Sequence, residues 1–205
     1  MSGQCEDCCG PKDLTHTTPR YRRALVVVVV LNLGMGVVEM AGGVFGRSQA
    51  LKADSLDFLG DGAITLLGLL AISRGQRWRA RAALLQGIFL AILGVGVIGA
   101  ACFRLYEKVL PDAATMGVLG VVGLVVNVAC ALVLVPHRDG DANVRAVWLF
   151  SRNDALGNIA VAIAGGLVAW LGQAWPDLVT AAVIAALFLS SAWQIVRGAR
   201  RELNI

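Results

Sequence analysis

Three aspartates lie on one side of a long apolar segment of the chain. Asp54, Asp57 and Asp61 fall within Ala50–Ile72, which is otherwise apolar enough to cross a membrane. Spacings of three and four residues place them on one stripe of a helix. An ionised carboxylate at the centre of a bilayer costs on the order of 2.5 to 3.5 kcal/mol even on an insertion scale, so three of them indicate a function. Crowded carboxylates in a dry site need protons or a cation, and the stripe therefore predicts cation binding.

A fourth aspartate belongs to another apolar segment, Val147–Leu171. Asp154 lies about two turns into this segment, and Asn158 follows one turn later on the same face. With a rise of about 1.5 Å per residue and a hydrocarbon core of about 30 Å, Asp61 and Asp154 reach depths within one turn of each other. We therefore expect Asp57, Asp61 and Asp154 to converge near mid-membrane, with Asn158 available as a further oxygen donor. A divalent cation would neutralise such a site, whereas a purely structural alternative is a protonated cluster that holds the helices together.

Three further polar residues lie inside apolar segments. Asn32 and Glu39 are seven residues apart and share a face of the first segment. Glu39 either reaches the outer interface, where it could meet Arg47, or takes part in function. Asn127 is deep enough to form a hydrogen bond between helices.

The elements that must position these residues are membrane-spanning helices. Of the 205 residues, 57% are hydrophobic and 16% are charged, whereas about 25% are charged in an ordinary soluble domain. Each apolar segment approaches or exceeds the ~20 residues that a spanning helix needs. The expected spans are Ala24–Phe45, Ala50–Ile72, Ala82–Phe103, Ala113–Val135, Val147–Leu171 and Leu178–Val196. The first is too long for the apolar part of a signal peptide, so we expect it to remain in the mature chain. The fold class is therefore an all-α membrane protein with six transmembrane helices.

The basic residues predict the orientation of these helices. One face carries Lys12, Arg20, Arg22, Arg23, Arg74, Arg77, Arg79, Arg81, Arg138, Arg145, Arg197, Arg200 and Arg201, and the other carries Arg47, Lys52, Arg104 and Lys108. The positive-inside rule then places both termini in the cytoplasm, in a multi-pass protein of the inner (plasma) membrane. The net charge of +4 is explained by this insertion signal, and no basic stretch is interleaved with aromatic residues in a way that suggests nucleic-acid binding.

The chain divides into a tail, one membrane domain and a short basic end, at residues 1–23, 24–196 and 197–205. The tail holds four ligands that prefer soft metal ions, Cys5, Cys8, Cys9 and His16. Disulfides are not expected on the reducing cytoplasmic side, so the tail is either a metal-capturing segment or an uncommitted disordered end.

The first two spans resemble those of the cation diffusion facilitator family. The resemblance rests on the pattern N-x6-E-x3-G-x4-S-x-A-L-x2-D-x2-[H/D]-x3-D, which here reads Asn32, Glu39, Gly43, Ser48, Ala50, Leu51, Asp54, Asp57 and Asp61. The fifth span resembles the family at Asp154-Ala-Leu-Gly, and the entry to the sixth resembles it at Trp175-Pro176-Asp177. This resemblance implies six helices, a homodimer, and export of Zn²⁺ or a related divalent cation from the cytoplasm in exchange for protons. It also implies that the metal is held between the second and fifth helices.

Two features of the chain depart from the family. The family's four ligand positions correspond to Asp57, Asp61, Asp154 and Phe150, and a phenylalanine cannot coordinate a metal. A site of carboxylates, with or without an amide, is harder than the usual zinc site. It could therefore prefer Mn²⁺, Fe²⁺ or Co²⁺, bind zinc more weakly, or recruit Asn158 or Asn153 as a substitute donor. The second departure is the absence of the family's cytosolic C-terminal domain, so a dimer would have to form through the membrane helices.

The leading prediction is a proton-coupled exporter of divalent cations, most simply Zn²⁺, with Cd²⁺, Co²⁺, Mn²⁺ or Fe²⁺ as alternatives. It needs no cofactor and is not an enzyme. One alternative is a non-transporting membrane adaptor that buffers metal through its cysteine tail. Another is an intramembrane metal-dependent phosphotransferase whose motif would begin at Asp54-x2-Asp57. That motif wants a glycine where Phe58 stands, and its remaining residues are absent.

Overall fold

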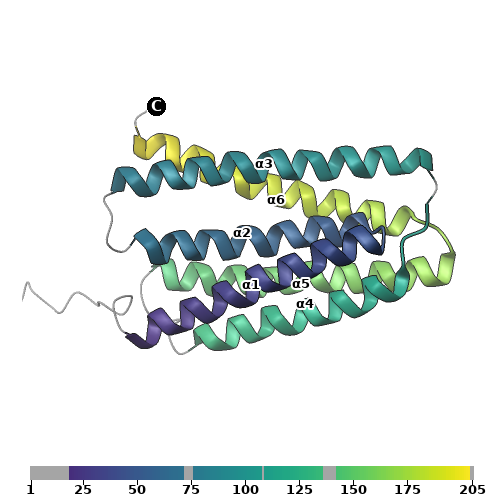
Figure 1. The fold of residues 1–205 in the computed structure, drawn as a ribbon, viewed down its shortest axis with the longest axis horizontal. Helices are drawn as coiled ribbons and strands as arrows, with labels where there is room; N and C mark the ends of the chain where they lie inside the picture. Colours follow the sequence, from purple (N-terminus) through teal and green to yellow (C-terminus); the bar gives the residue numbers. More distant parts are fainter. Residues whose placement is uncertain (1–18, 72–75, 108, 136–141, 204–205) are drawn as a thin grey trace, which may run out of the picture.

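The computed structural model describes residues 19–71, 76–107, 109–135 and 142–203, and within the fifth helix it describes the side chains from Asp154 onward. Over these residues the chain forms six helices and no strand, as the sequence predicts (Figure 1). The helices are α1 (Pro19–Phe45), α2 (Gln49–Ala71), α3 (Gln76–Glu107), α4 (Ala113–Leu134), α5 (Ala142–Leu171) and α6 (Trp175–Leu203).

Several helices are longer than the apolar segments that predict them. α3 begins at Gln76 and α6 continues to Leu203, beyond the predicted Ala82 and Val196. The added turns are rich in arginine and include Ala80 and Ala199, and both residue types favour helix even where the apolar pattern has ended.

Five of the six helices are long and apolar enough to cross a membrane, and α2 is the exception. It is 23 residues long, so its length suffices. Its polarity sets it apart, because it carries Lys52 together with the three aspartates of the acidic stripe. The helix that is least suited to lipid by composition is therefore the one that carries the candidate site.

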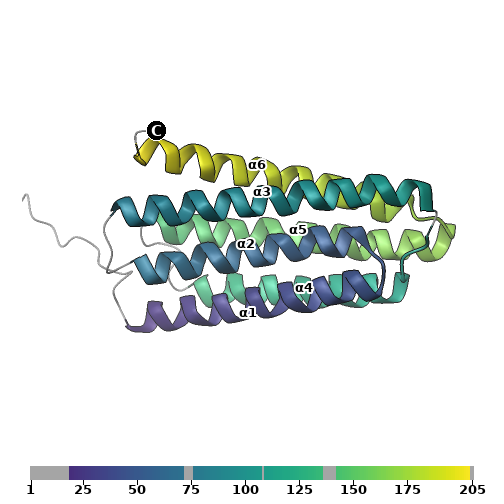
Figure 2. The same ribbon diagram turned by 45° about the horizontal axis from the view of Figure 1, so that its top comes forward.

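The helices run alternately up and down, and their ends gather at two faces (Figures 1 and 2). The connections α1–α2, α3–α4 and α5–α6 lie at one end, which we call the outer end in keeping with the expected orientation. Pro19 and Leu203 both lie at the opposite, inner end, so the first and last described helical residues are on the same side of the bundle. This arrangement agrees with the prediction that both termini share one face of the membrane.

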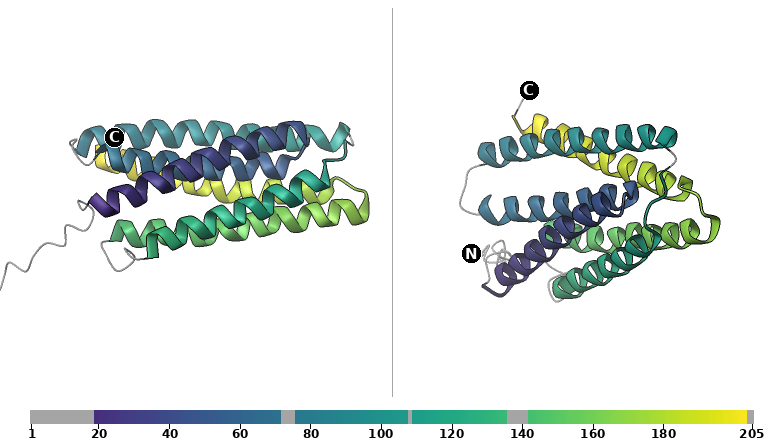
Figure 3. Two further views of the ribbon diagram at one scale, coloured as in Figure 1. Left: turned by 60° about the horizontal axis from the view of Figure 1, so that its bottom comes forward. Right: turned by 45° about the vertical axis from the view of Figure 1, so that its right-hand side comes forward.

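The bundle is built from three closely packed helix pairs: α1 with α2, α4 with α5, and α3 with α6. The α3–α6 pair lies to one side of the other four helices, with α2 between it and α1 (Figure 3). α2 also packs against α6 and α3, whereas its contact with α5 is short. The acidic stripe of α2 is thus in the middle of the molecule and can reach α1, α4 and α5.

Hydrogen bonds at the outer end hold the short connections together. The amide of Gly46 donates to the carbonyl of Gly42 (2.7 Å), and the amide of Asp112 donates to the carbonyl of Gly46 (2.8 Å). Arg47 takes a left-handed backbone conformation with φ of 56°, which reverses the chain within a few residues. The α1–α2 turn is thereby tied to the start of α4.

Asp177 at the start of α6 caps the first turn of α2. Its carboxylate accepts hydrogen bonds from the hydroxyl of Ser48 (2.5 Å), the amide of Gln49 (2.9 Å) and the amide of Ala50 (3.0 Å). These amides have no partner within the helix, so a buried carboxylate from another helix satisfies them. The residue is 1% exposed, and the cap fixes the outer end of α2 against α6.

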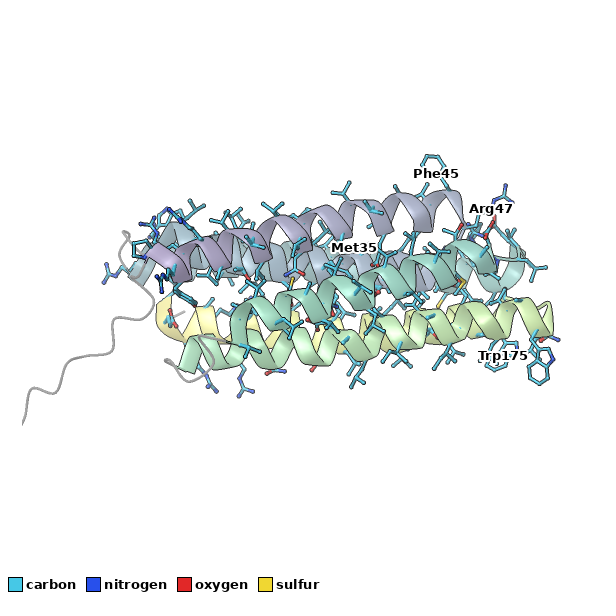
Figure 4. All side chains as sticks on the ribbon, turned by 90° about the horizontal axis from the view of Figure 1, so that it is seen from below. Met35, Phe45, Arg47 and Trp175 are labelled. Carbon is cyan, nitrogen blue, oxygen red and sulfur yellow. The ribbon has the colours of Figure 1, made fainter. Side chains whose placement is uncertain are left out.

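Apolar side chains fill the interior and also cover the lipid-facing surface. The core includes Leu56 of α2, Met116 of α4, Val161 of α5 and Phe188 of α6. On the outside, valine, isoleucine, phenylalanine and tryptophan side chains project from every helix. Figure 4 shows Phe45, Arg47 and Trp175 projecting at the outer end, where tryptophan is favoured at the boundary between lipid and water.

Candidate functional site

A narrow internal space lies where α1, α2, α4 and α5 meet. Its lining residues are Asn32, Asp54, Asp57, Phe58, Asp61, Asn127 and Asp154. Six of the seven are acidic or carry an amide, so oxygen atoms dominate the lining. The space is too narrow for a water molecule, so any ion that enters must be bound by side chains rather than by its own hydration shell.

Asp154 brings the acidic groups of two helices together. Its carboxyl group is in hydrogen-bonding contact with the carboxyl groups of both Asp57 and Asp61. All three side chains are half-buried. The aspartates of α2 and α5 therefore face one another, as the depth estimate predicts.

The three carboxyl groups meet in pairs rather than around a common centre. In the described part of the chain, no group of three acidic, histidine or cysteine side chains surrounds a position for a metal ion. Contacts of this kind between carboxyl groups require shared protons, because two ionised carboxylates repel. In this arrangement the three side chains do not surround a common position, and they would have to rotate before they could share a metal.

Asn158 lies beside this space but does not line it. It is 0% exposed, and its Nδ2 donates to the carbonyl of Asp154 (3.2 Å) in the preceding turn. Its Oδ1 points toward Gly123 of α4 and has no hydrogen-bond partner among the residues that the structure describes. Two other amides, Asn32 and Asn127, line the space instead.

Asn32 and Asn127 are not among the ion donors predicted from the sequence. Two features of the sequence could have indicated that these amides line the site. Asn127 lies deep within α4, and Asn32 belongs to the family pattern. Asp54 was placed on the acidic stripe but was not proposed as a ligand, and it too lines the space.

Glu39 is buried between helices. Its side chain is 0% exposed, so the alternative in which it reaches the outer interface is wrong. Its carboxyl group contacts that of Asp54, and neither of its oxygens receives a hydrogen bond from another donor within the described parts of the chain.

Several predicted donors lie outside the described residues. They are Cys5, Cys8, Cys9 and His16 of the tail, and the side chains of Phe150 and Asn153 in α5. The helical backbone of α5 does include positions 150 and 153.

The fold and the acidic centre define a class of membrane protein. A family model described as the cation efflux transmembrane domain matches residues 25–204 of the chain. The chain belongs to this family of cation efflux proteins, the cation diffusion facilitators, which are multi-pass membrane transporters rather than enzymes.

Three curated relatives illustrate the similarity. A "Cadmium, cobalt and zinc/H(+)-K(+) antiporter" of Bacillus subtilis is 25% identical over 198 residues, covering 89% of this chain and 63% of the relative. The "Zinc transporter ZitB" of Escherichia coli is 28% identical over 195 residues, covering 88% of this chain and 62% of the relative. The "Metal cation efflux system protein CzcD" of Cupriavidus metallidurans is 26% identical over 198 residues, covering 89% and 61%. The chain thus matches less than two thirds of the length of each of these proteins.

Proposed function

We propose that this protein exports a divalent metal cation, most simply Zn²⁺, across the inner (plasma) membrane in exchange for protons. The observation that carries the proposal is the contact of Asp154 on α5 with Asp57 and Asp61 on α2. Family membership supports cation efflux. The names of the relatives support zinc, cadmium and cobalt as candidate substrates and an antiport mechanism.

The chemistry of the three aspartates suits alternate binding of protons and metal. In the proton-loaded form the carboxyl groups share protons and contact one another directly. In the metal-loaded form the deprotonated carboxylates bind the ion, which replaces the protons as the charge that offsets their repulsion. Each metal ion bound therefore releases protons, and reversal of this step on the other side of the membrane completes an antiport cycle.

The donor set bears on which ions can be bound. Carboxylate and amide oxygens are hard ligands that suit Mn²⁺ and also bind Zn²⁺ at about 2.0 to 2.2 Å. We propose Asp57, Asp61 and Asp154 as the ligands. Asn158, which the sequence suggested as a fourth ligand, would have to turn its amide oxygen away from α4 to join them.

Transport by purified protein in proteoliposomes tests the proposal. Under a pH gradient, the wild-type chain should accumulate Zn²⁺ and move protons in the opposite direction. Asp61→Asn and Asp154→Asn should each lower this exchange by about 100-fold, because each removes a charged ligand while keeping the side-chain shape. Asp112→Asn, an exposed residue at the start of α4, is the matched control and should transport normally. Undiminished exchange in both site variants would refute the proposed site.

Deletion of residues 1–18 separates export from the adaptor alternative. An exporter should still move metal across the membrane without its cysteine-containing tail. An adaptor that only buffers metal should lose its activity with the tail.

A further inference from the structure

A second group of buried oxygens lies one helical turn outward from the aspartates just described. It consists of the carboxyl groups of Glu39 on α1 and Asp54 on α2 and the amide oxygen of Asn158 on α5. These residues are 0%, 1% and 0% exposed. Asp54 precedes Asp57 by three residues and Asn158 follows Asp154 by four, which corresponds to about 5 to 6 Å along each helix.

Two of the three groups, Asn158 and Glu39, lie beside Gly123 of α4, whose missing side chain leaves room for them. A Cβ atom added to Gly123 would overlap Asn158 Oδ1 and would lie 2.7 Å from Glu39 Oε1. Both oxygens are thus beside the same point, close enough to bind one ion. Asp54 Oδ1 lies 3.2 Å from the position of a Cβ on Gly157, next to Asn158 along α5, and the Asp54 carboxyl contacts that of Glu39.

These oxygens could accept more hydrogen bonds than the described residues donate to them. Glu39 and Asp54 contact each other through their carboxyl groups. Apart from that contact, both oxygens of Glu39, Oδ2 of Asp54 and Oδ1 of Asn158 receive no hydrogen bond from a donor among the described residues. The amide of Asn158 is held in this orientation because its Nδ2 donates to the carbonyl of Asp154. Buried polar atoms without a donor are costly, so an unexplained set of them on three helices indicates a ligand.

We propose that Glu39, Asp54 and Asn158 form a second cation-binding site, which receives the divalent ion from the aspartates of the first site on its way outward. Two carboxylates neutralise an ion of charge +2, whereas a monovalent ion would leave an uncompensated negative charge in the interior. Asp54 also lines the space that contains Asp57, Asp61 and Asp154, so the ion can pass between the sites without losing all of its oxygen ligands. This inference rests on the proposed function, because it takes the transported ion as the ligand.

Binding of Mn²⁺ to the full-length chain in nanodiscs tests the second site. Mn²⁺ is the probe because it prefers oxygen ligands, which reduces competition from the tail cysteines. Asp61→Asn/Asp154→Asn removes two ligands of the first site, so any ion that remains bound can be counted by equilibrium dialysis. We expect about one Mn²⁺ per chain in this variant, and we expect adding Glu39→Gln to weaken its binding at least tenfold.

Two glycine variants on α4 provide an independent test with a matched control. In the same background, Gly123→Ala places a methyl group on the position of Asn158 Oδ1, displaces this ligand and should also weaken Mn²⁺ binding at least tenfold. Gly117→Ala adds the same methyl group to the same helix, where no atom outside the helix backbone lies within 4 Å, and should leave Mn²⁺ binding unchanged. Size-exclusion profiles and circular dichroism show which variants fold. If only one of Glu39→Gln and Gly123→Ala folds, its Mn²⁺ binding is sufficient to test the second site.

The inference is overturned if the Asp61→Asn/Asp154→Asn variant retains no Mn²⁺, or if the retained ion is insensitive to Glu39→Gln and Gly123→Ala. The second result would mean that Glu39 and Asp54 only join α1 to α2 through a shared proton. Neither result affects the proposed function, which depends on metal and proton exchange by the wild-type chain and its loss in the single variants of the first site.

Discussion

Asp154 is the residue through which α5 reaches the acidic stripe of α2. α2 and α5 touch only briefly, yet one aspartate contacts two others across that interface. Removing this single side chain would leave two aspartates on α2 with no ligand from the facing helix. The contact between α5 and the acidic stripe in the candidate site therefore depends on one carboxyl group, that of Asp154.

A histidine at position 150 should change the metal preference. Phe150 lies four residues before Asp154 on α5, one helical turn away, and it occupies a ligand position in the family resemblance. Phe150→His would add a nitrogen donor and favour a tetrahedral zinc site. We expect the affinity for Zn²⁺ to rise by about tenfold or more, equivalent to about 1.4 kcal/mol, with a smaller gain for Mn²⁺. Calorimetric titration of the two metals measures both, and equal gains would contradict the assignment of this position.

The sequence predicts the acidic residues of the site better than the amides around it. Three carboxylates at matched depths in apolar segments are costly unless they lie close together and share protons or a cation, so their depths alone predict that they meet. A residue four positions further along a helix lies about one turn higher and is rotated by about 40°. The sequence therefore predicts the depth of an amide better than the direction in which its side chain points. Asn158 Oδ1 lies beside Gly123 on α4 and near Glu39 on α1, outside the space that the aspartates line.

The elements are held in place by caps and close contacts as well as by apolar packing. α2 must keep its acidic stripe directed inward although its composition is less favourable in lipid than that of the other helices. The cap from Asp177 restrains it, and so does the close approach of α1 at Gly43, where an added Cβ would lie 3.0 Å from the amide nitrogen of Lys52. The helix limits in the apolar core follow from the sequence, but a cap supplied by a residue 127 to 129 positions away along the chain cannot be predicted from local pattern.

Asp177→Ala should destabilise the outer end of α2. The carboxylate accepts three buried hydrogen bonds, and a bond to a charged group contributes about 1.5 to 3 kcal/mol. Asp112→Ala is the control, because Asp112 caps its own helix α4 through a single exposed bond from the Thr115 amide (2.8 Å), which contributes about 1 kcal/mol. Unfolding in denaturing detergent should show a larger loss for Asp177→Ala, and an equal or smaller loss would contradict the role given to this cap.

Adjacent glycines in α5 should respond differently to the same substitution. A Cβ on Gly165 would lie 2.9 Å from Met116 Cβ and 3.0 Å from the amide nitrogen of Gly117, whereas a Cβ on Gly166 has nothing within 4 Å. Gly165→Ala should therefore cost about 1 to 3 kcal/mol by forcing α4 and α5 apart. Gly166→Ala should be neutral or stabilising by up to about 1 kcal/mol. Unfolding free energies of the two variants check this, and similar values would show that the α4–α5 contact tolerates expansion.

For the whole molecule, the sequence predicts six helices, and the described residues confirm them. The basic residues predict which end faces the cytoplasm, and the structure places the first and last described helical residues at one end. The homodimer implied by the family resemblance remains a prediction. The pairing of α3 with α6 to one side of the other helices was not predicted, because every span offers a similar apolar surface and periodicity does not select a neighbour.

Thiol labelling of intact cells measures the orientation. In a background without native cysteines, Arg47→Cys in the α1–α2 turn should react with a membrane-impermeant maleimide from outside. Arg197→Cys near the inner end of α6 should react only after the membrane is permeabilised. The reverse pattern would invert the assignment of the outer end and, with it, the direction of export.

The most direct test of the central claim is anomalous diffraction from crystals of the full-length chain grown with Zn²⁺ near neutral pH. We expect one anomalous peak between α2 and α5, about 2.0 to 2.2 Å from carboxylate oxygens of Asp57, Asp61 and Asp154. The peak should be absent from crystals of Asp154→Asn grown in the same way. Strong zinc peaks elsewhere on the protein, with none between these two helices in the wild-type crystal, would contradict the claim that their aspartates bind the transported ion.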